Sequence, residues 1–156
     1  MDEPKKPPPP NRCDADPSRL VKVGGPVDRS KVSLRLFGDS LVPAEVTRLL
    51  CCEPTRAFRK GDVEPDKRYH RVASQGSWLL EGALPENAGI EEQVAALLGR
   101  LTNDLPVWQR LTTDFRADVF CGVFLEEWSR GFGLSPRLTK MLGERGLEIG
   151  FDIFCL

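Results

Sequence analysis

A strand-and-helix pattern that occurs twice is the feature that most constrains the fold of this chain. In the first copy an alternating apolar segment, 32–37, precedes a helix that starts at Pro43. In the second copy, segment 119–125 precedes a helix that starts at Pro136. Alternation at a period of two predicts a half-buried strand, and the fixed φ of proline suits the first turn of a helix. The repeat therefore predicts two β-α-β units.

Two further segments complete these units. Segments 77–80 and 147–153 supply the closing strands, and apolar residues at helical spacing over 90–101 predict an additional helix between the units. This order predicts an α+β fold with ferredoxin-like split β-α-β layers, in which an antiparallel four-stranded sheet carries the additional helix between strands 2 and 3. The first and third strands are then central. This places Arg35 beside acidic side chains on the face away from the core, namely Asp118, Glu148 or Asp152.

Composition divides the chain into a tail and one domain. Residues 1–30 hold seven of the 13 prolines and few large apolar groups, which predicts a disordered proline-rich tail. The remainder, 31–156, has the length and apolar content of a single domain. The chain begins with no basic segment followed by an apolar one, and no segment is long and apolar enough for a membrane span. We therefore expect a cytoplasmic protein without a membrane partner.

The sequence offers little chemistry for catalysis. Five cysteines are present, none at the two-residue spacing of zinc ribbons, so we expect free thiols, no metal and no cofactor. His70 is the only histidine, and the sequence places no nucleophile beside it. An enzyme would need a pocket that holds His70 or perturbed carboxylates. The sequence favours a protein without catalytic residues.

A basic loop is the first candidate site. Lys plus Arg (22) nearly cancels Asp plus Glu (23) over the whole chain, yet basic residues are concentrated between positions 56 and 71. Arginine offers paired donors for phosphate or carboxylate. The candidate ligand-binding residues are Arg56, Arg59, Lys60, Arg68 and Arg71. The alternative is a solvated loop whose charges pair with Asp62, Glu64 and Asp66.

Aromatic residues on the central strands allow two interpretations. Phe37, Phe120 and Phe124 resemble the exposed rings of an RNA-recognition domain. The RNA-binding signature is missing, however, and Asp118 and Glu126 flank the rings with unfavourable charge. We therefore expect helix 90–101 to cover these rings, and nucleic acid is not the expected partner.

Protein interaction is the second candidate role. Trp78 falls in a predicted strand and is expected in the core, whereas Trp128 lies in a turn, where an exposed ring suits a partner surface. The interaction candidates combine this tryptophan with charged and aromatic residues of the predicted sheet: Trp128, Phe124, Phe120, Arg35 and Asp152.

Several short motifs follow one another in a characteristic order along the chain: Phe37-Gly38-Asp39, Pro43, Leu49-Leu50, the segment 53–62, Ser77-Trp78, Cys121-Gly122-Val123-Phe124 and Leu134-Ser135-Pro136. With this order and spacing, residues 31–156 resemble the bacterial family catalogued as domain of unknown function 4279. The resemblance implies no established activity, substrate or catalytic residue. Some members of that family are similar to immunity-type proteins that accompany bacterial toxins, which implies a protein partner.

Two functions follow as expectations. The first is a non-enzymatic protein-interaction module of the immunity type, with a partner of unknown identity. The alternative is a binder of a small phosphorylated ligand or nucleic acid through the basic loop 56–71. Neither the ligand nor the oligomeric state follows from the sequence.

Overall fold

A computed structural model describes residues 25–65, 70–127 and 130–155. The predicted proline-rich tail lies almost entirely outside these residues. The described part contains, in chain order, β1 (Arg29–Gly38), α1 (Pro43–Leu50), β2 (Arg56–Phe58), β3 (Val63–Pro65), β4 (His70–Val72), β5 (Gly76–Glu81), α2 (Ile90–Gly99), α3 (Leu105–Asp114), β6 (Arg116–Leu125), α4 (Pro136–Glu144) and β7 (Glu148–Cys155).

Five strands form one mixed sheet in the order β2-β5-β1-β6-β7, and β3 and β4 form a separate hairpin. The α+β class is confirmed, but the antiparallel four-stranded sheet is wrong. Strands β6 and β7 are parallel neighbours joined by α4, whereas β2 runs parallel to β1 with β5 inserted between them. The strand that completes the first unit is therefore β2, and the expected closing strand 77–80 is instead part of β5, the antiparallel neighbour of β1. The additional strand β2 was not expected because it has three residues, too few for a recognisable alternation.

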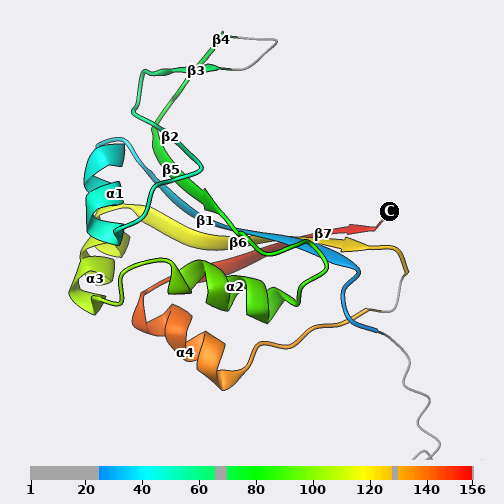
Figure 1. The fold of residues 1–156 in the computed structure, drawn as a ribbon. Coiled ribbons are helices and arrows are strands. Elements are labelled where there is room, and N and C mark those ends of the chain that lie inside the picture. Colours follow the sequence, from blue (N-terminus) through cyan, green and yellow to red (C-terminus); the bar gives the residue numbers. More distant parts are fainter. Residues whose placement is uncertain (1–24, 66–69, 128–129, 156) are drawn as a thin grey trace, which may run out of the picture.

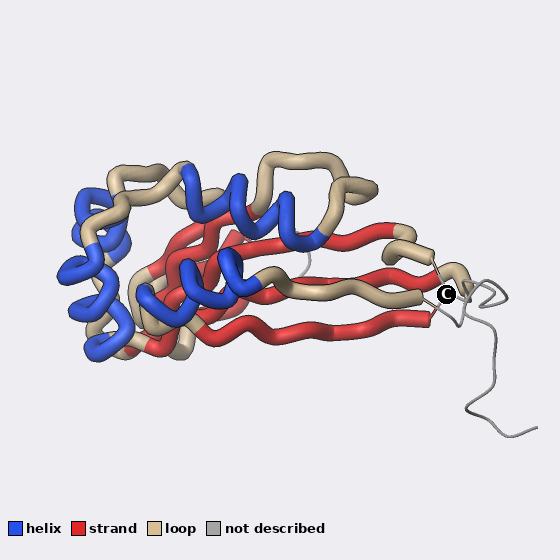
Figure 2. Tube along the Cα trace, turned by 90° about the horizontal axis from the view of Figure 1, so that it is seen from below, coloured by secondary structure: helices blue, strands red, loops and turns tan. Residues whose placement is uncertain are grey.

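All four helices cover the same face of the sheet (Figures 1 and 2). Alternate residues of β1 and β6 point toward the helices and form one apolar core with them. Trp78 and Trp108 are the largest residues in this core and are fully buried. Each indole N–H is satisfied, by the Thr47 hydroxyl at 3.0 Å and by the Thr102 carbonyl at 2.8 Å respectively. The core position expected for Trp78 is confirmed.

No helix of the described residues lies on the opposite face of the sheet, which corrects an expectation. Helix α2 buries Val94, Leu97 and Leu98 in the core, on the face away from Phe37, Phe120 and Phe124. These rings alternate with core residues along their strands, so a helix cannot pack against both sets. The phenylalanines therefore lie half-buried on an open face, hereafter the open face.

The start of α4 is joined to α2 by a side-chain network. Ser135 caps α4 by accepting a hydrogen bond from the Leu138 N–H at 3.2 Å, as its position before Pro136 predicts. Its own hydroxyl and N–H donate to the Glu91 carboxylate at 2.5 and 3.0 Å. These two hydrogen bonds, with that of the Ser135 side chain the stronger, hold the pKa of Glu91 below its ordinary value of 4.5.

A pH dependence of stability follows from Glu91. Because the folded-state pKa lies below 4.5, its stabilising contribution is complete above that pH and is lost as the pH falls through the folded-state value. We expect Glu91→Gln to lower the free energy of unfolding at neutral pH and to flatten its decrease on acidification. Urea denaturation at a series of pH values measures this. The exposed neighbour Glu92 provides the control, since an equal effect of Glu92→Gln would contradict the assignment.

Candidate functional site

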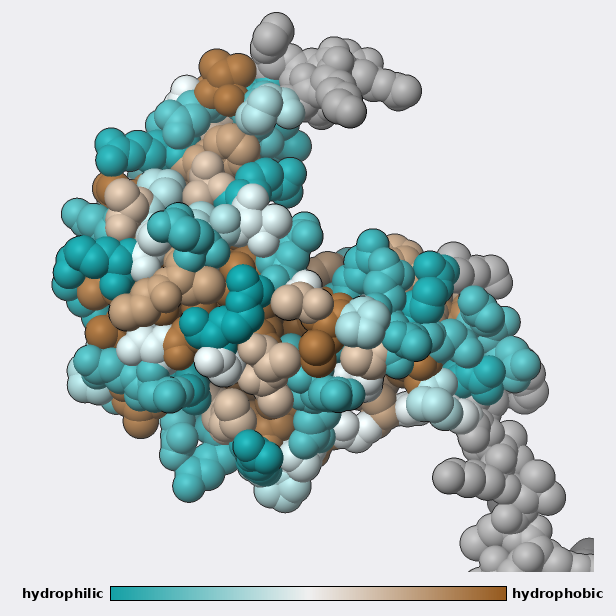
Figure 3. All heavy atoms as spheres, viewed as in Figure 1, coloured by the Kyte–Doolittle hydropathy of each residue, from teal (hydrophilic) through white to brown (hydrophobic). Residues whose placement is uncertain are grey.

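The β3–β4 hairpin stands on the open face and forms a cleft with the sheet. Figure 3 shows the surface hollowed between the hairpin and the sheet. The cavity there has a volume of about 320 Å³ and is lined by residues of β1, β2, β5 and the hairpin: Arg35, Phe37, Arg56, Phe58, Glu64, Arg71, Ser74, Gln75, Ser77 and Leu79. We call this cavity the hairpin cleft. It combines three arginines and one glutamate with two phenylalanines.

The base of the hairpin is held by a tight turn. Gly61 has a φ of 90°, in the left-handed region that favours glycine, and its N–H donates to the Ala73 carbonyl at 2.8 Å. Asp62 accepts a hydrogen bond from the Arg59 N–H at 2.7 Å, and its own carbonyl accepts one from the Ala73 N–H. Lys60 forms an ion pair with Asp39, in the loop after β1. These contacts fix where the hairpin leaves the sheet, and they give Arg59 and Lys60 positions at its base rather than in the cleft.

Arg35 is the most rigidly positioned cation of the cleft. Its guanidinium donates twice to Asp118 on β6, from Nε at 2.7 Å and from Nη2 at 2.9 Å, and it lies 4.2 Å from the centre of the Phe120 ring. The side chains of Arg35 and Asp118 are 25% and 12% exposed. A bidentate, partly buried pair of this kind holds both groups in one geometry. The pairing of Arg35 with an acidic residue of the open face is confirmed, and the partner is Asp118.

A second layer of cation and ring contacts extends this cluster. The guanidinium carbons of Arg35 and Arg116 lie 5.8 and 5.7 Å from the centre of the Phe37 ring. Arg116 also approaches Asp118, at 3.8 Å. Cation–ring contacts of this kind contribute about 0.5–1 kcal/mol each at exposed positions. The floor of the cleft is therefore preorganised before any ligand binds.

Two of the five predicted ligand-binding residues line the cleft. Arg56 on β2 and Arg71 on β4 are exposed, and neither forms an ion pair with any residue that the structure describes. Arg68 lies outside the described residues. The cleft thus brings Arg56 and Arg71 of the basic loop together with Arg35, which was expected to act in protein interaction instead.

The predicted interaction residues that the structure describes are dispersed over the open face. Phe120 supports Arg35 beside the cleft, whereas Phe124 stacks on Phe154 at 5.2 Å, toward the far ends of β6 and β7. Asp152 is exposed on β7 opposite Gly122. Trp128 lies outside the described residues. The four candidates within the described residues do not form one site.

Several cleft residues were missed by sequence reasoning. Phe58, Ser77 and Leu79 join the cleft because β2 pairs with β5 and presents alternate residues to the open face. Glu64 and Arg71 face each other in the hairpin register. The only available signal was the alternation of residues 56–58, which a three-residue strand makes too brief to detect.

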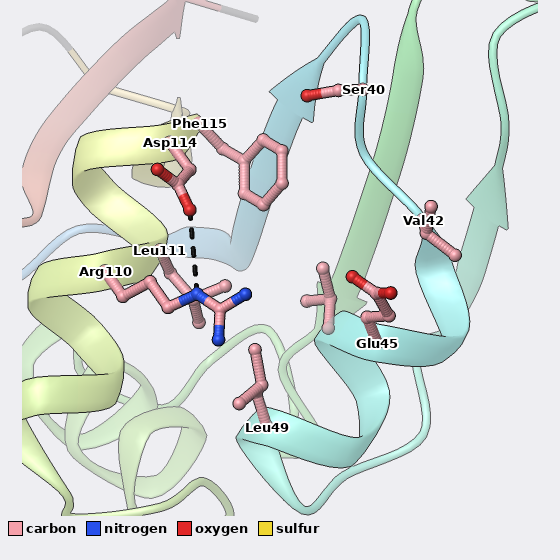
Figure 4. A pocket seen from close by; sticks show the side chains of 9 residues that line it. Ser40, Val42, Glu45, Leu49, Arg110, Leu111, Asp114 and Phe115 are labelled. Carbon is pink, nitrogen blue, oxygen red and sulfur yellow. Dashed lines mark ion pairs between the residues drawn. The ribbon is translucent and has the colours of Figure 1, made fainter.

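A second cavity, between α1 and α3, has a volume of about 270 Å³ (Figure 4). Its base is apolar, with Leu49 and Leu111 from the two helices. Its one cation, Arg110, lies 3.7 Å from Asp114 on the same helix, and Glu45 faces the cavity from α1. With two carboxylates and one guanidinium, the lining of this cavity has more anions than cations. The hairpin cleft is the stronger candidate because its cations exceed its anions.

The described residues contain no group of three or more histidine, cysteine, aspartate or glutamate side chains arranged to hold a metal ion. Cys121 is fully buried in β6, and burial raises the pKa of its thiol to about 12. A thiol with so high a pKa is a poor nucleophile. Among the described helices, none has the length and apolar character needed to cross a membrane.

Comparisons with known proteins address the family of the chain rather than its chemistry. No curated protein matches the chain, and no solved structure matches it. The model of one family, the domain of unknown function DUF4279, matches residues 28–156, which include the sheet, all four helices and the hairpin cleft. The chain therefore belongs to the DUF4279 family, as the resemblance of its motifs indicated.

Proposed function

We propose that this protein is a non-enzymatic interaction module that binds an acidic segment of a partner protein in the hairpin cleft. The observation that carries the proposal is the lining of the cleft, where two exposed arginines outnumber one glutamate, beside two phenylalanines and an Arg35 that Asp118 neutralises. Arginine and aromatic residues are enriched in protein interfaces, where they supply large contact areas together with directed hydrogen bonds. An immunity-type role, with a toxin as the partner, is one form of this proposal.

The cations of the cleft have distinct tasks in this proposal. Arg35 is held by Asp118 and keeps its position, so it orients a bound carboxylate at little entropic cost. Arg56 on β2 and Arg71 on β4 also line the cleft and supply further guanidinium groups to the ligand. Phe37 and Phe58 provide apolar surface for the aliphatic part of an acidic segment. The cleft holds only one described carboxylate, Glu64, which favours recognition over acid–base catalysis.

A small phosphorylated ligand is the second candidate. The volume of about 320 Å³ falls at the lower end of small-molecule pockets. Guanidinium groups bind phosphate as well as carboxylate. Nucleic acid is less favoured, because Asp118 and Glu148 place negative charge on the same open face and the net charge of the chain is −1.

Binding of labelled probes tests the proposal. We expect a fluorescein-labelled octaglutamate peptide to bind the full chain, as measured by fluorescence anisotropy, with an affinity that falls as salt rises. An octalysine peptide with the same label is the control and should not bind. Displacement of the peptide by low concentrations of inorganic pyrophosphate would favour the second candidate. Failure of both the peptide and pyrophosphate to bind at low salt would contradict an anion-binding cleft.

A further inference from the structure

Strand β7 forms one edge of the sheet and differs sharply from the edge at β2. It spans eight residues and pairs only with β6, so the backbone N–H and C=O groups on its other side have no partner strand among the described residues. Natural edge strands are usually protected by charged side chains, lysine above all, by proline, by a bulge or by short length. Of these devices β7 has only the two carboxylates Glu148 and Asp152. Strand β7 contains no lysine and no proline, and its register with β6 runs without interruption from Asp118↔Glu148 to Leu125↔Cys155.

The same strand carries much of the exposed apolar surface of the domain. Five large apolar residues are exposed in the described part of the chain, and three of them lie on or beside β7: Phe132, Ile153 and Phe154. Ile153 is 57% exposed and Phe154 is 46% exposed, although their side chains point to opposite faces of the sheet. Phe132 packs against Phe151 with their ring centres 4.9 Å apart. A strand added beside β7 would cover apolar groups on both faces.

We propose that β7 pairs with β7 of a second copy of this chain, antiparallel and around a twofold axis at Phe151. The two five-stranded sheets then join into one continuous sheet of ten strands. The charge pattern supports a second copy as the partner strand, because this register places no like charges opposite each other. Its pairs are Phe151 with its own copy, Gly150 with Asp152, Ile149 with Ile153 and Glu148 with Phe154.

Neighbouring registers are disfavoured by charge. Pairing around Gly150 would place Glu148 directly opposite Asp152, and pairing around Asp152 would place two aspartates opposite each other. Like charges in directly opposed positions destabilise a strand pair. Registers centred nearer either end of β7 pair fewer residues. Only the register around Phe151 pairs residues 148–154 of both copies without such a conflict.

The dimer would leave the hairpin cleft open, because β7 and β2 lie at opposite edges of the sheet. Two clefts would then belong to one particle, which strengthens the binding of a partner that carries two acidic segments. This inference does not depend on the proposed function. Dimerisation is tested by substitutions on β7 and anion binding by substitutions in the hairpin cleft, so the failure of one can be told from the failure of the other.

Sedimentation equilibrium of the full chain tests the dimer. We expect a concentration-dependent mass that approaches two copies, and we expect Ile153→Lys to weaken the association by at least about 100-fold, because it places a charge in the apolar contact with Ile149. The matched control is Val63→Lys on the hairpin, since Val63 is also 57% exposed. Val63→Lys should leave the association unchanged. A wild-type chain that sediments as one copy at every concentration would overturn the proposal, as would a dimer that Ile153→Lys does not affect.

Disulfide trapping tests the register. In a chain with Cys13, Cys51, Cys52 and Cys155 replaced by serine, we expect Phe151→Cys to form a crosslinked dimer under copper–phenanthroline oxidation. Directly opposed residues are within reach of a disulfide, whereas the two copies of residue 152 would be diagonal neighbours about 7–8 Å apart, which is too far. Asp152→Cys is therefore the control. Crosslinking of Asp152→Cys in place of Phe151→Cys would overturn the arrangement, and the sedimentation result stands if Phe151→Cys does not fold.

Discussion

The double variant Arg56→Glu/Arg71→Glu is expected to bind the labelled octaglutamate peptide at least about 100-fold more weakly than the wild-type chain at low salt. Hydrogen bonds to charged groups contribute about 1.5–3 kcal/mol each, and exposure places these two at the lower end of that range. Their loss therefore corresponds to roughly 3 kcal/mol, and charge repulsion adds to it. Anisotropy titration measures the change.

The control for this variant carries the same change in net charge on the helical side of the molecule. Arg48 on α1 and Arg137 on α4 are both exposed and lie outside the cleft. Arg48→Glu/Arg137→Glu should retain nearly all of the affinity. Equal losses in the two double variants would mean that net charge, rather than the hairpin cleft, determines binding.

Replacing Trp78 by alanine is expected to have the largest effect on stability. Trp78 is fully buried between the sheet and α1, and its N–H donates to the Thr47 hydroxyl. Large-to-small substitution of a buried tryptophan lowers the free energy of unfolding by about 3–5 kcal/mol, because apolar contacts are lost and a cavity remains. Urea denaturation followed by circular dichroism measures the loss.

The neighbouring residue Leu79 provides the matched control for Trp78. Its side chain points to the open face and is half-buried in the wall of the cleft. We expect Leu79→Ala to lower the free energy of unfolding by less than about half as much as Trp78→Ala does, since Leu79 buries less apolar area. A larger loss for Leu79→Ala would contradict the assignment of the helical side as the core.

Much of the local structure could be predicted from the sequence, because the local signals were strong. The alternation in β1 and β6 predicts both strands and their inward faces, and the Ser135-Pro136 pair predicts the start of α4. The turn at Gly61-Asp62 follows from residue type alone. Family membership follows from the order of the motifs.

Features that depend on contacts between distant segments could not be predicted in this way. Two strands joined by a helix can be direct neighbours or can flank a third strand, and residue patterns do not distinguish these arrangements. For this reason the parallel pairing of β6 with β7 was missed. Strands β2, β3 and β4 have three residues each, and without them Arg56 and Arg71 remain in an apparent loop.

The three phenylalanines of the open face were expected beneath helix 90–101, and this expectation was wrong. Phe37, Phe120 and Phe124 alternate with the core residues of their strands, so periodicity places them opposite the core. The expectation that helix 90–101 covers them assumed that this helix needs the rings as an apolar surface to pack on. Ion pairs and cation–ring contacts with Arg35 and Arg29 surround these rings instead. The open face thus presents aromatic and charged side chains next to the hairpin cleft.

The most direct test of the account is a titration of the isotope-labelled full chain with octaglutamate, followed by two-dimensional amide NMR. We predict that the largest shift changes fall on the residues that line the hairpin cleft, above all Arg35, Arg56, Phe58, Arg71 and Ser77, and that α4 and the groove between α1 and α3 change little. Shift changes concentrated in that groove, or spread evenly over exposed cations of the helical side, would contradict the assignment of the cleft as the binding site.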